Sequence, residues 1–273
     1  MKLLKRIFDF YLDASIHVAL ALFALLEVTS LTLNISHDVH LAMFLFFGTI
    51  SAYNFIKYGV EAEKYILVAN RYQKSIQLFS MATLVFAIYH AYFLPMTTWP
   101  IIGGLLLLTG VYALPVLPKA KNVRSWGGLK IFVVALVWAG ATVLLPIVSQ
   151  NYPVSWDVSM EAVQRFLIVL ILMVPFEIRD LAYDRPELRT VPQRLGVANT
   201  KVFGGIALVL FFFITFLKDD VSIQETIAKG ILFLLLGSMV LVTKRDQGKY
   251  FASFWVEAVP VFCWGMVLVL KRY

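Results

Sequence analysis

Apolar residues are concentrated in nine stretches of the chain, most of them close to the length of a membrane-spanning helix. A spanning helix needs about 20 mostly apolar residues. The nine stretches are 16–35, 39–57, 75–94, 99–117, 129–148, 162–178, 201–217, 228–243 and 251–270. Most of them lack the polar–apolar alternation of a membrane β-barrel, and backbone groups inside hydrocarbon must otherwise be satisfied within helices. The pattern predicts an all-α polytopic membrane protein with about nine transmembrane helices in a bundle.

Composition supports a single membrane domain over residues 1–273. Hydrophobic residues make up 60% of the chain and charged residues 15%, with a mean hydropathy of +0.79, whereas soluble domains are about half apolar and a quarter charged. The first 14 residues alternate basic with apolar or aromatic side chains, which predicts a short interfacial helix. Asp9 and Asp13 are out of place in a signal peptide, so we interpret this segment as retained.

The placement of charge predicts an orientation. If the N-terminus is cytoplasmic and nine spans alternate, 19 of the 24 basic residues lie on the inner side, as the positive-inside rule requires. We therefore expect a multi-pass protein of the bacterial inner (plasma) membrane, in contact with anionic lipid. No basic stripe is interleaved with aromatic residues, so nucleic-acid binding is not expected. Cys263 is the single cysteine and excludes a disulfide within the chain.

Three acids follow the sixth apolar stretch. On a helical wheel Glu177, Asp180 and Asp184 fall within an arc of about 60°, and none has a basic residue three or four positions away within the helix. Two such charges roughly 6 Å apart at an effective dielectric constant of about 20 repel by about 2.8 kcal/mol. The acids therefore need a counter-charge, either a cation or a basic side chain from another helix. Carboxylate oxygens suit a hard ion such as magnesium.

This segment resembles the second aspartate-rich motif of the UbiA superfamily of intramembrane prenyltransferases. The family pattern R-D-x-x-x-D-R, with a T-x-P and L-G tail, is similar to Arg179–Arg185 followed by Thr190, Pro192, Leu195 and Gly196. Segment 111–146 is similar to the central region of the family, and nine spans with a cytoplasmic N-terminus also agree. The resemblance extends over nearly the whole chain, and its most specific part surrounds Asp180.

The resemblance implies transfer of a prenyl group from an isoprenoid diphosphate to a lipophilic acceptor, such as an aromatic compound. In the family two acidic motifs at the cytoplasmic side hold Mg²⁺, the metal binds the diphosphate, and an acceptor attacks the allylic cation in an apolar chamber. Metal would neutralise the leaving group, and a dry chamber would protect the cation. By this reading Asp180 and Asp184 are catalytic metal ligands, supported by Glu177.

The first family motif, N-x-x-x-D-x-x-x-D, is degenerate here. Asn54 is present, but Tyr58 and Ala62 replace the two aspartates. We expect Asn54 to orient metal or diphosphate and Tyr58 to contact the diphosphate or the acceptor. Glu61 shares the arc of Asn54 and Tyr58, so it either supplies a metal ligand or pairs with Lys57. The chain accordingly binds one metal rather than two, uses another donor, or has lost the reaction.

Basic residues near both motifs complete the predicted site. Lys119 and Arg124 lie in the loop after the fourth stretch, and Arg179 and Arg185 flank the acids. Each is interpreted either as a diphosphate contact, for which guanidinium groups are suited, or as an ordinary inside or headgroup-facing charge.

Three functions remain open from the sequence. The first is a prenyltransferase. The second is a UbiA-like protein that has lost catalysis and binds an isoprenoid or lipid, or assists a partner, which the missing aspartates favour. The third and least favoured is a transporter, suggested by Glu27 and Glu257 at membrane depth. The acceptor, the prenyl chain length and the oligomeric state are left open.

Overall fold

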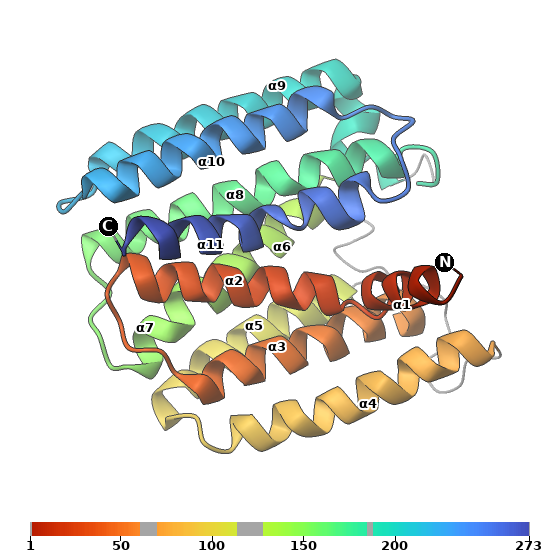
Figure 1. Cartoon of the computed structure of the whole chain (residues 1–273), viewed down its shortest axis with the longest axis horizontal. Coiled ribbons are helices and arrows are strands. Elements are labelled where there is room, and N and C mark those ends of the chain that lie inside the picture. Colours follow the sequence, from red (N-terminus) through yellow and green to blue (C-terminus); the bar gives the residue numbers. More distant parts are fainter. Residues whose placement is uncertain (1, 61–69, 114–127, 185–187, 273) are drawn as a thin grey trace.

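Long helices lying side by side form the described part of the chain (Figure 1). The structure is a computed structural model and describes residues 2–60, 70–113, 128–184 and 188–272. No β-strand occurs within these residues. The predicted all-α membrane bundle is therefore confirmed as a fold class.

The helices follow the predicted apolar stretches closely. Their bounds are α1 Lys2–Asp13, α2 Ile16–Thr32, α3 Val39–Asn54, α4 Arg71–Ala91, α5 Trp99–Ala113, α6 Leu129–Ala139, α7 Leu145–Ser149, α8 Trp156–Asp180, α9 Val191–Ile214, α10 Ile223–Val242 and α11 Val259–Leu270. Short π-helical segments extend three of the spans: η1 Phe55–Val60 after α3, η4 Gly140–Leu144 between α6 and α7, and η7 Phe251–Val256 before α11.

The predicted count of nine spans is not confirmed. Seven helical segments are long and apolar enough to cross a membrane within the described ranges, and the pair α1–α2, bent by 57°, makes eight if it counts as one broken span. The stretch predicted at 75–94 corresponds to α4, which is not among the seven. Its first turns carry Arg71 and Lys74, which lower its hydropathy.

The bundle has two chemically distinct ends. One end, here called the acidic-motif end, carries Glu177, Asp180 and Asp184 together with α1 and the start of η7 (Figure 1). The other, here called the opposite end, carries the start of α8, the start of α10 and the last turn of α11 (Figure 1). Helix α8 connects the two ends and packs against α6 and α9. Its central residues are buried, as in Ile171 at 1% exposure.

The tail of the acidic motif begins a helix. We expected the next span to start at residue 201, but α9 starts at Val191. The side chain of Gln193 accepts a hydrogen bond from the backbone N–H of Thr190 at 2.9 Å, which satisfies an amide that the first turn leaves free. Pro192 lies in the first turn, where its missing N–H costs nothing. Gly196 then bends the helix with φ of 78°, a conformation that favours glycine.

Helix α9 approaches α8 and α10 at Gly204. A β-carbon at this position would lie 3.2 Å from Val174 Cγ2 and 3.4 Å from Val240 Cγ1. The adjacent Gly205 has nothing within 4 Å of its β-carbon position. The three-helix contact therefore depends on one glycine of the pair and not on the other.

We predict that Gly204→Leu destabilises the protein by about 1–3 kcal/mol, because the added side chain overpacks the contact with Val174 and Val240. The matched control is Gly205→Leu, which should leave stability near wild type. Thermal unfolding of both variants in detergent measures the difference. Equal melting temperatures for the two variants would contradict this packing.

Candidate functional site

The three acids of the motif lie at the end of α8, which terminates at Asp180. The backbone N–H of Asp184 still donates to the Asp180 carbonyl at 2.8 Å, so the helical hydrogen-bond pattern reaches Asp184. The acids differ in burial. Glu177 is 2% exposed, Asp184 18% and Asp180 32%. Ligands can therefore reach Asp180 and Asp184 more readily than Glu177.

Lys130 is the counter-charge to two of these acids. Its Nζ lies 2.7 Å from Glu177 Oε1 and 3.5 Å from Asp184 Oδ2. The lysine stands in the first turn of α6 and is 11% exposed. Of the two counter-charges that the sequence left open, the structure provides a basic side chain from another helix. The sequence indicated only that Lys130 is a basic residue expected on the cytoplasmic side. Its pairing could not be predicted, because its partners lie about fifty residues away in the chain.

Asp180 has a different partner. Arg179 Nε donates to Asp180 Oδ1 at 2.8 Å, and the same guanidinium lies over the ring of Phe176 at 5.0 Å. We considered pairs three or four positions apart, which face each other on a helix, and so missed this pair of neighbours. Both side chains are 32% exposed, so the pair is open to exchange for a ligand.

Asn54 holds the first motif segment to its neighbours. Its Oδ1 accepts from Ser15 Oγ at 2.8 Å, and its Nδ2 donates to the Ala14 carbonyl at 3.0 Å and to Ser80 Oγ at 2.9 Å. The amide therefore connects the α1–α2 turn, α3 and α4, and it is buried at 3% exposure. Asn54 thus has a structural role in joining these segments. Its predicted role in orienting metal or diphosphate stays a prediction.

Tyr58 also bonds to the end of α1. Its hydroxyl donates to the Asp13 carbonyl at 3.0 Å, and Lys57 Nζ lies 3.8 Å from Asp13 Oδ1. Tyr72 Oη donates to the other carboxylate oxygen of Asp13 at 2.9 Å. These hydrogen bonds do not bear on the predicted contact of Tyr58 with a substrate, which stays a prediction. Four predicted residues lie outside the described ranges, and their roles stay predictions: Glu61, Lys119, Arg124 and Arg185.

Two isolated acids in apolar stretches lie at different ends of the bundle. Glu257, between η7 and α11, interacts electrostatically with Arg179 and Lys57. It thus lies near both motif segments, although we left it out of the predicted site. Glu27 Oε1 lies 2.8 Å from His37 Nδ1, near the opposite end.

The described residues fit one metal ion better than two. Within the described ranges no group of three or more His, Cys, Asp and Glu side chains is arranged to hold a metal. Magnesium, however, is commonly held by one or two carboxylates together with substrate phosphates and water. Asp180 and Asp184 can supply such a pair. The buried Glu177 Oε2 has no hydrogen-bond partner among the described residues, so the motif retains an unused acceptor.

Solved structures share this architecture. No family model and no curated protein sequence matches the chain. A UbiA homologue from Archaeoglobus fulgidus bound to GPP and Mg²⁺ superposes with a TM-score of 0.62 at 11% identity, over 96% of this chain and 99% of that one. The chain has the UbiA fold.

Two further structures agree with this UbiA fold. The same homologue bound to DMAPP and Mg²⁺ gives a TM-score of 0.58 at 11% identity, over 96% of this chain and 99% of that one. A structure reported for digeranylgeranylglyceryl phosphate synthase in membranes gives 0.58 at 15% identity, over 99% and 97% of the two chains. The predicted resemblance to the UbiA superfamily is thus confirmed at the level of the fold, and the multi-pass membrane architecture with it.

We predict that Lys130→Met costs about 3–5 kcal/mol of stability, because it leaves Glu177 buried without a counter-charge. The double variant Lys130→Met/Glu177→Gln should recover most of this loss. The exposed Lys244→Met serves as the control and should melt like wild type. Thermal unfolding in detergent distinguishes the four proteins. A double variant no more stable than Lys130→Met would contradict the pairing.

Proposed function

We propose that this protein transfers a prenyl group from an isoprenoid diphosphate to a lipophilic acceptor within the membrane. The observation that carries the proposal is the R-D-x-x-x-D-R sequence at residues 179–185 on the end of a UbiA-fold helix, where two aspartates stay partly exposed. The UbiA homologue of this fold that was solved with GPP and Mg²⁺ supports the choice of substrate class. We further propose the bacterial inner membrane as the location.

The acidic motif would bind the diphosphate through a single magnesium ion. Asp180 and Asp184 would hold the ion, and Mg²⁺ bound there would neutralise charge on the leaving diphosphate. Lys130 holds Asp184 and Glu177 on one side, which fixes the direction of the Asp184 carboxylate. Glu177, through its free oxygen, would complete the ligand set or accept from a metal-bound water.

The cations around the motif would contact the phosphate oxygens directly. Arg179 can release Asp180 and offer its fork of N–H donors to a phosphate. Arg185, Lys119 and Arg124 are proposed for the same task. On the first motif segment, Asn54 and Tyr58 would border the substrate, with Glu61 as a further proposed metal ligand.

The acceptor reaches the site from the membrane in this proposal. A bundle whose helices are apolar over most of their surface keeps water away from a reactive allylic group. A lipophilic acceptor partitions into the same apolar medium, so it arrives without a soluble carrier. This accounts for an intramembrane site at the end of a helix rather than in a separate soluble domain.

A second function is favoured by specific observations. Lys130 already pairs with Glu177 and Asp184, and the Asn54 amide makes three hydrogen bonds within the protein. Tyr58 and Ala62 stand where the family has aspartates. These features suit a protein that binds an isoprenoid diphosphate or another lipid without transferring the chain. Transport has no comparable observation in its favour.

We predict that the wild-type protein, with Mg²⁺ and labelled farnesyl or longer diphosphates, releases pyrophosphate and forms a prenylated lipid in membranes. Asp180→Asn and Asp184→Asn should each lower the rate at least ~100-fold, since each removes charge that stabilises the transition state. The exposed Asp246→Asn is the matched control and should keep full activity.

The two functions give different results in this experiment. Release of pyrophosphate that depends on Asp180 and Asp184 supports transfer and excludes the binding-only function. Magnesium-dependent binding of the diphosphate without release, lost in the same two variants, supports the binding function. Binding and release that are both unchanged in Asp180→Asn/Asp184→Asn would refute the assignment of the acidic motif.

A further inference from the structure

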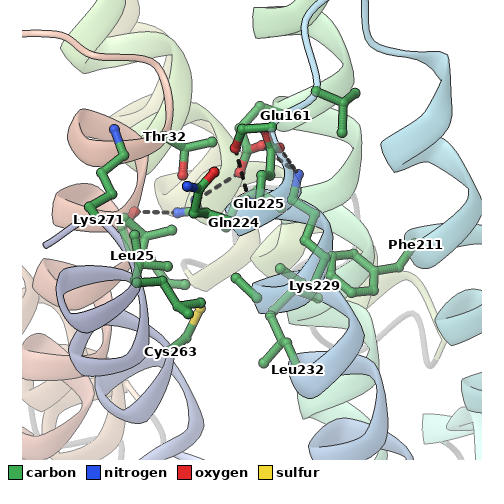
Figure 2. A pocket seen from close by; sticks show the side chains of 18 of the residues that line it. Leu25, Thr32, Glu161, Phe211, Gln224, Glu225, Lys229, Leu232, Cys263 and Lys271 are labelled. Atoms are coloured by element: carbon green, nitrogen blue, oxygen red, sulfur yellow. Dashed lines mark hydrogen bonds and ion pairs between the residues drawn. The ribbon is translucent and has the colours of Figure 1, made fainter. Parts of the chain in front are cut away.

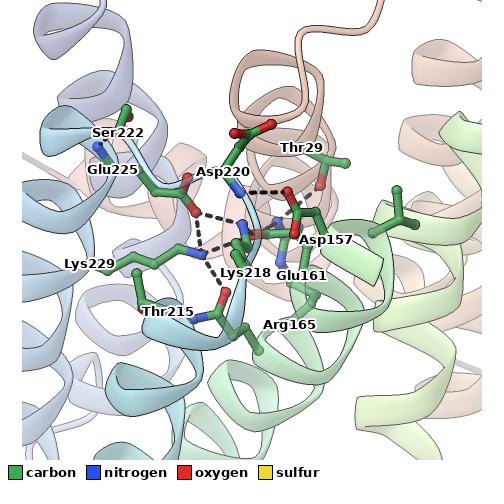
Figure 3. A network of polar contacts seen from close by, with 12 residues as sticks. Thr29, Asp157, Glu161, Arg165, Thr215, Lys218, Asp220, Ser222, Glu225 and Lys229 are labelled. Atoms are coloured by element: carbon green, nitrogen blue, oxygen red, sulfur yellow. Dashed lines mark hydrogen bonds and ion pairs between the residues drawn. The ribbon is translucent and has the colours of Figure 1, made fainter. Parts of the chain in front are cut away.

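A second charged cluster is buried at the opposite end of the bundle. Glu161 and Arg165 of α8 meet Lys218, from the loop before α10, and Glu225 and Lys229 of α10 (Figure 3). Arg165 is fully buried, and Glu161, Lys218 and Lys229 are 2%, 7% and 8% exposed. This cluster has no part in the proposed prenyl transfer, because it lies at the other end of α8 from Asp180.

The cluster contains one more positive charge than negative. Glu161 Oε2 accepts from Lys218 Nζ at 2.7 Å and from Lys229 Nζ at 3.0 Å, and Glu161 Oε1 lies 3.4 Å from Arg165 Nη2. Glu225 Oε1 lies 2.5 Å from Lys218 Nζ and 2.7 Å from Lys229 Nζ. Three cations therefore share two carboxylates. An unbalanced buried charge is costly, so the cluster has the electrostatics of an anion site.

Lys218 of this cluster keeps its positive charge at neutral pH. Burial disfavours the charged form of Lys218, but the carboxylates of Glu161 and Glu225 outweigh that effect and raise the pKa of Lys218 above its ordinary value. Asp220 and Lys271 are exposed residues near the cluster. Their opposite charges offset each other. Asp157 of α8 lies beside the cluster (Figure 3), but its carboxylate accepts from the backbone N–H groups of Asp219 and Asp220 and forms no ion pair with the three cations. Among the side chains in direct contact, the excess of one positive charge therefore remains.

A cavity of about 630 Å³ adjoins the cluster. Figure 2 shows its two-part character, with Glu161, Gln224 and Glu225 at one side and Phe211, Leu232 and Cys263 at the other. The last three are buried at 0%, 3% and 5% exposure. This volume lies in the range of small-molecule sites, and the lining divides into a charged part and an apolar part, as an amphiphile would require.

Arg165 retains an unused donor in this cavity wall. Its Nη1 donates to the Leu25 carbonyl at 2.6 Å and to Thr142 Oγ1 at 3.0 Å, and its Nη2 donates to Thr29 Oγ1 at 3.0 Å. Its Nε is buried and has no hydrogen-bond partner among the described residues. Buried polar groups are nearly always hydrogen-bonded, so this lone donor, on a residue that borders the cavity, is an independent sign that an acceptor belongs beside it.

We propose that the cavity binds one anionic amphiphile, with a carboxylate or phosphate head at Arg165 and Lys229 and a hydrocarbon chain along Leu232 and Cys263. The head supplies the missing negative charge and an acceptor for Arg165 Nε. The chain fills the apolar part, which water would hydrate poorly. The site is separate from the acidic motif and takes a ligand without magnesium.

The test is equilibrium binding of radiolabelled dodecyl phosphate to the purified full-length protein in an uncharged detergent. Laurate should compete with it, since the shared chemistry is an anionic head on one chain. Dodecanol, which lacks the charge, and inorganic phosphate, which lacks the chain, should not compete. Competition by dodecanol as strong as by laurate, or competition by inorganic phosphate alone, would overturn the proposal. Absence of saturable binding would overturn it as well.

Opposite charge changes give a sharper result than either change alone. Lys229→Gln removes the excess positive charge and should weaken binding about tenfold, and Glu225→Gln increases the excess and should tighten binding by a similar factor. A purely structural cluster would shift both variants in the same direction, which would refute the proposal. Leu232→Trp fills the apolar part and should abolish binding even if Lys229→Gln fails to fold.

The acidic motif supplies a control that keeps the two sites apart. Asp180→Asn should leave dodecyl phosphate binding unchanged, whether or not it affects prenyl transfer. Binding that is lost in Asp180→Asn and retained in Leu232→Trp would place the amphiphile at the acidic motif and overturn the second site.

Discussion

A charge inside an apolar bundle has to be neutralised by a partner, and this requirement determines how the helices meet. At the acidic-motif end Lys130 of α6 lies between Glu177 and Asp184 of the α8 segment. At the opposite end Glu161 of α8 binds lysines from α10 and from the loop before it. Removing any one partner would leave a charge in a medium of low dielectric. The polar contacts therefore specify which helices are neighbours, a choice that apolar packing alone leaves open.

Helix α8 carries both charged groups and also keeps them apart. Glu161 and Glu177 are sixteen positions apart, which corresponds to about 24 Å along a helix axis. One ligand head cannot occupy both places. Between them, the residues from Leu167 to Leu172 are all apolar and buried. Two separate polar groups on one helix are thus joined by an apolar core, so the proposed diphosphate site and the proposed amphiphile site do not overlap.

The sequence predicted the positions of the helices and the acidic motif, but not the partners of its charges. Each apolar stretch overlaps a helix, because hydrocarbon leaves the backbone few alternatives. The span count was less secure, since α4 starts with charged turns. Lys130 and Glu177 are far apart in the chain, and no periodic pattern reports a contact between helices. The same holds for Arg165, which the structure buries completely and whose partners on α2 and η4 no sequence pattern indicates. A helical wheel gives the face of a residue, whereas its partner depends on tertiary packing.

The loss of aspartates from the first motif increases the importance of the cations near the second motif. Tyr58, at a position where the family has an aspartate, donates to the end of α1. Asn54, which matches the asparagine of the family motif, binds the Ala14 carbonyl and Ser80, so this segment stabilises the turn between α1 and α2. With fewer carboxylate ligands, the proposed site would hold a single divalent ion, which offsets only part of the negative charge of a diphosphate. In the proposed site the remaining charge of a diphosphate would have to be met by side chains, and guanidinium groups can do this through paired hydrogen bonds. Arg179 already stands beside Asp180 in a pair that is one-third exposed. A ligand that binds Arg179 would at the same time free Asp180 for metal, so the proposed function would couple diphosphate binding to metal binding at one helix end.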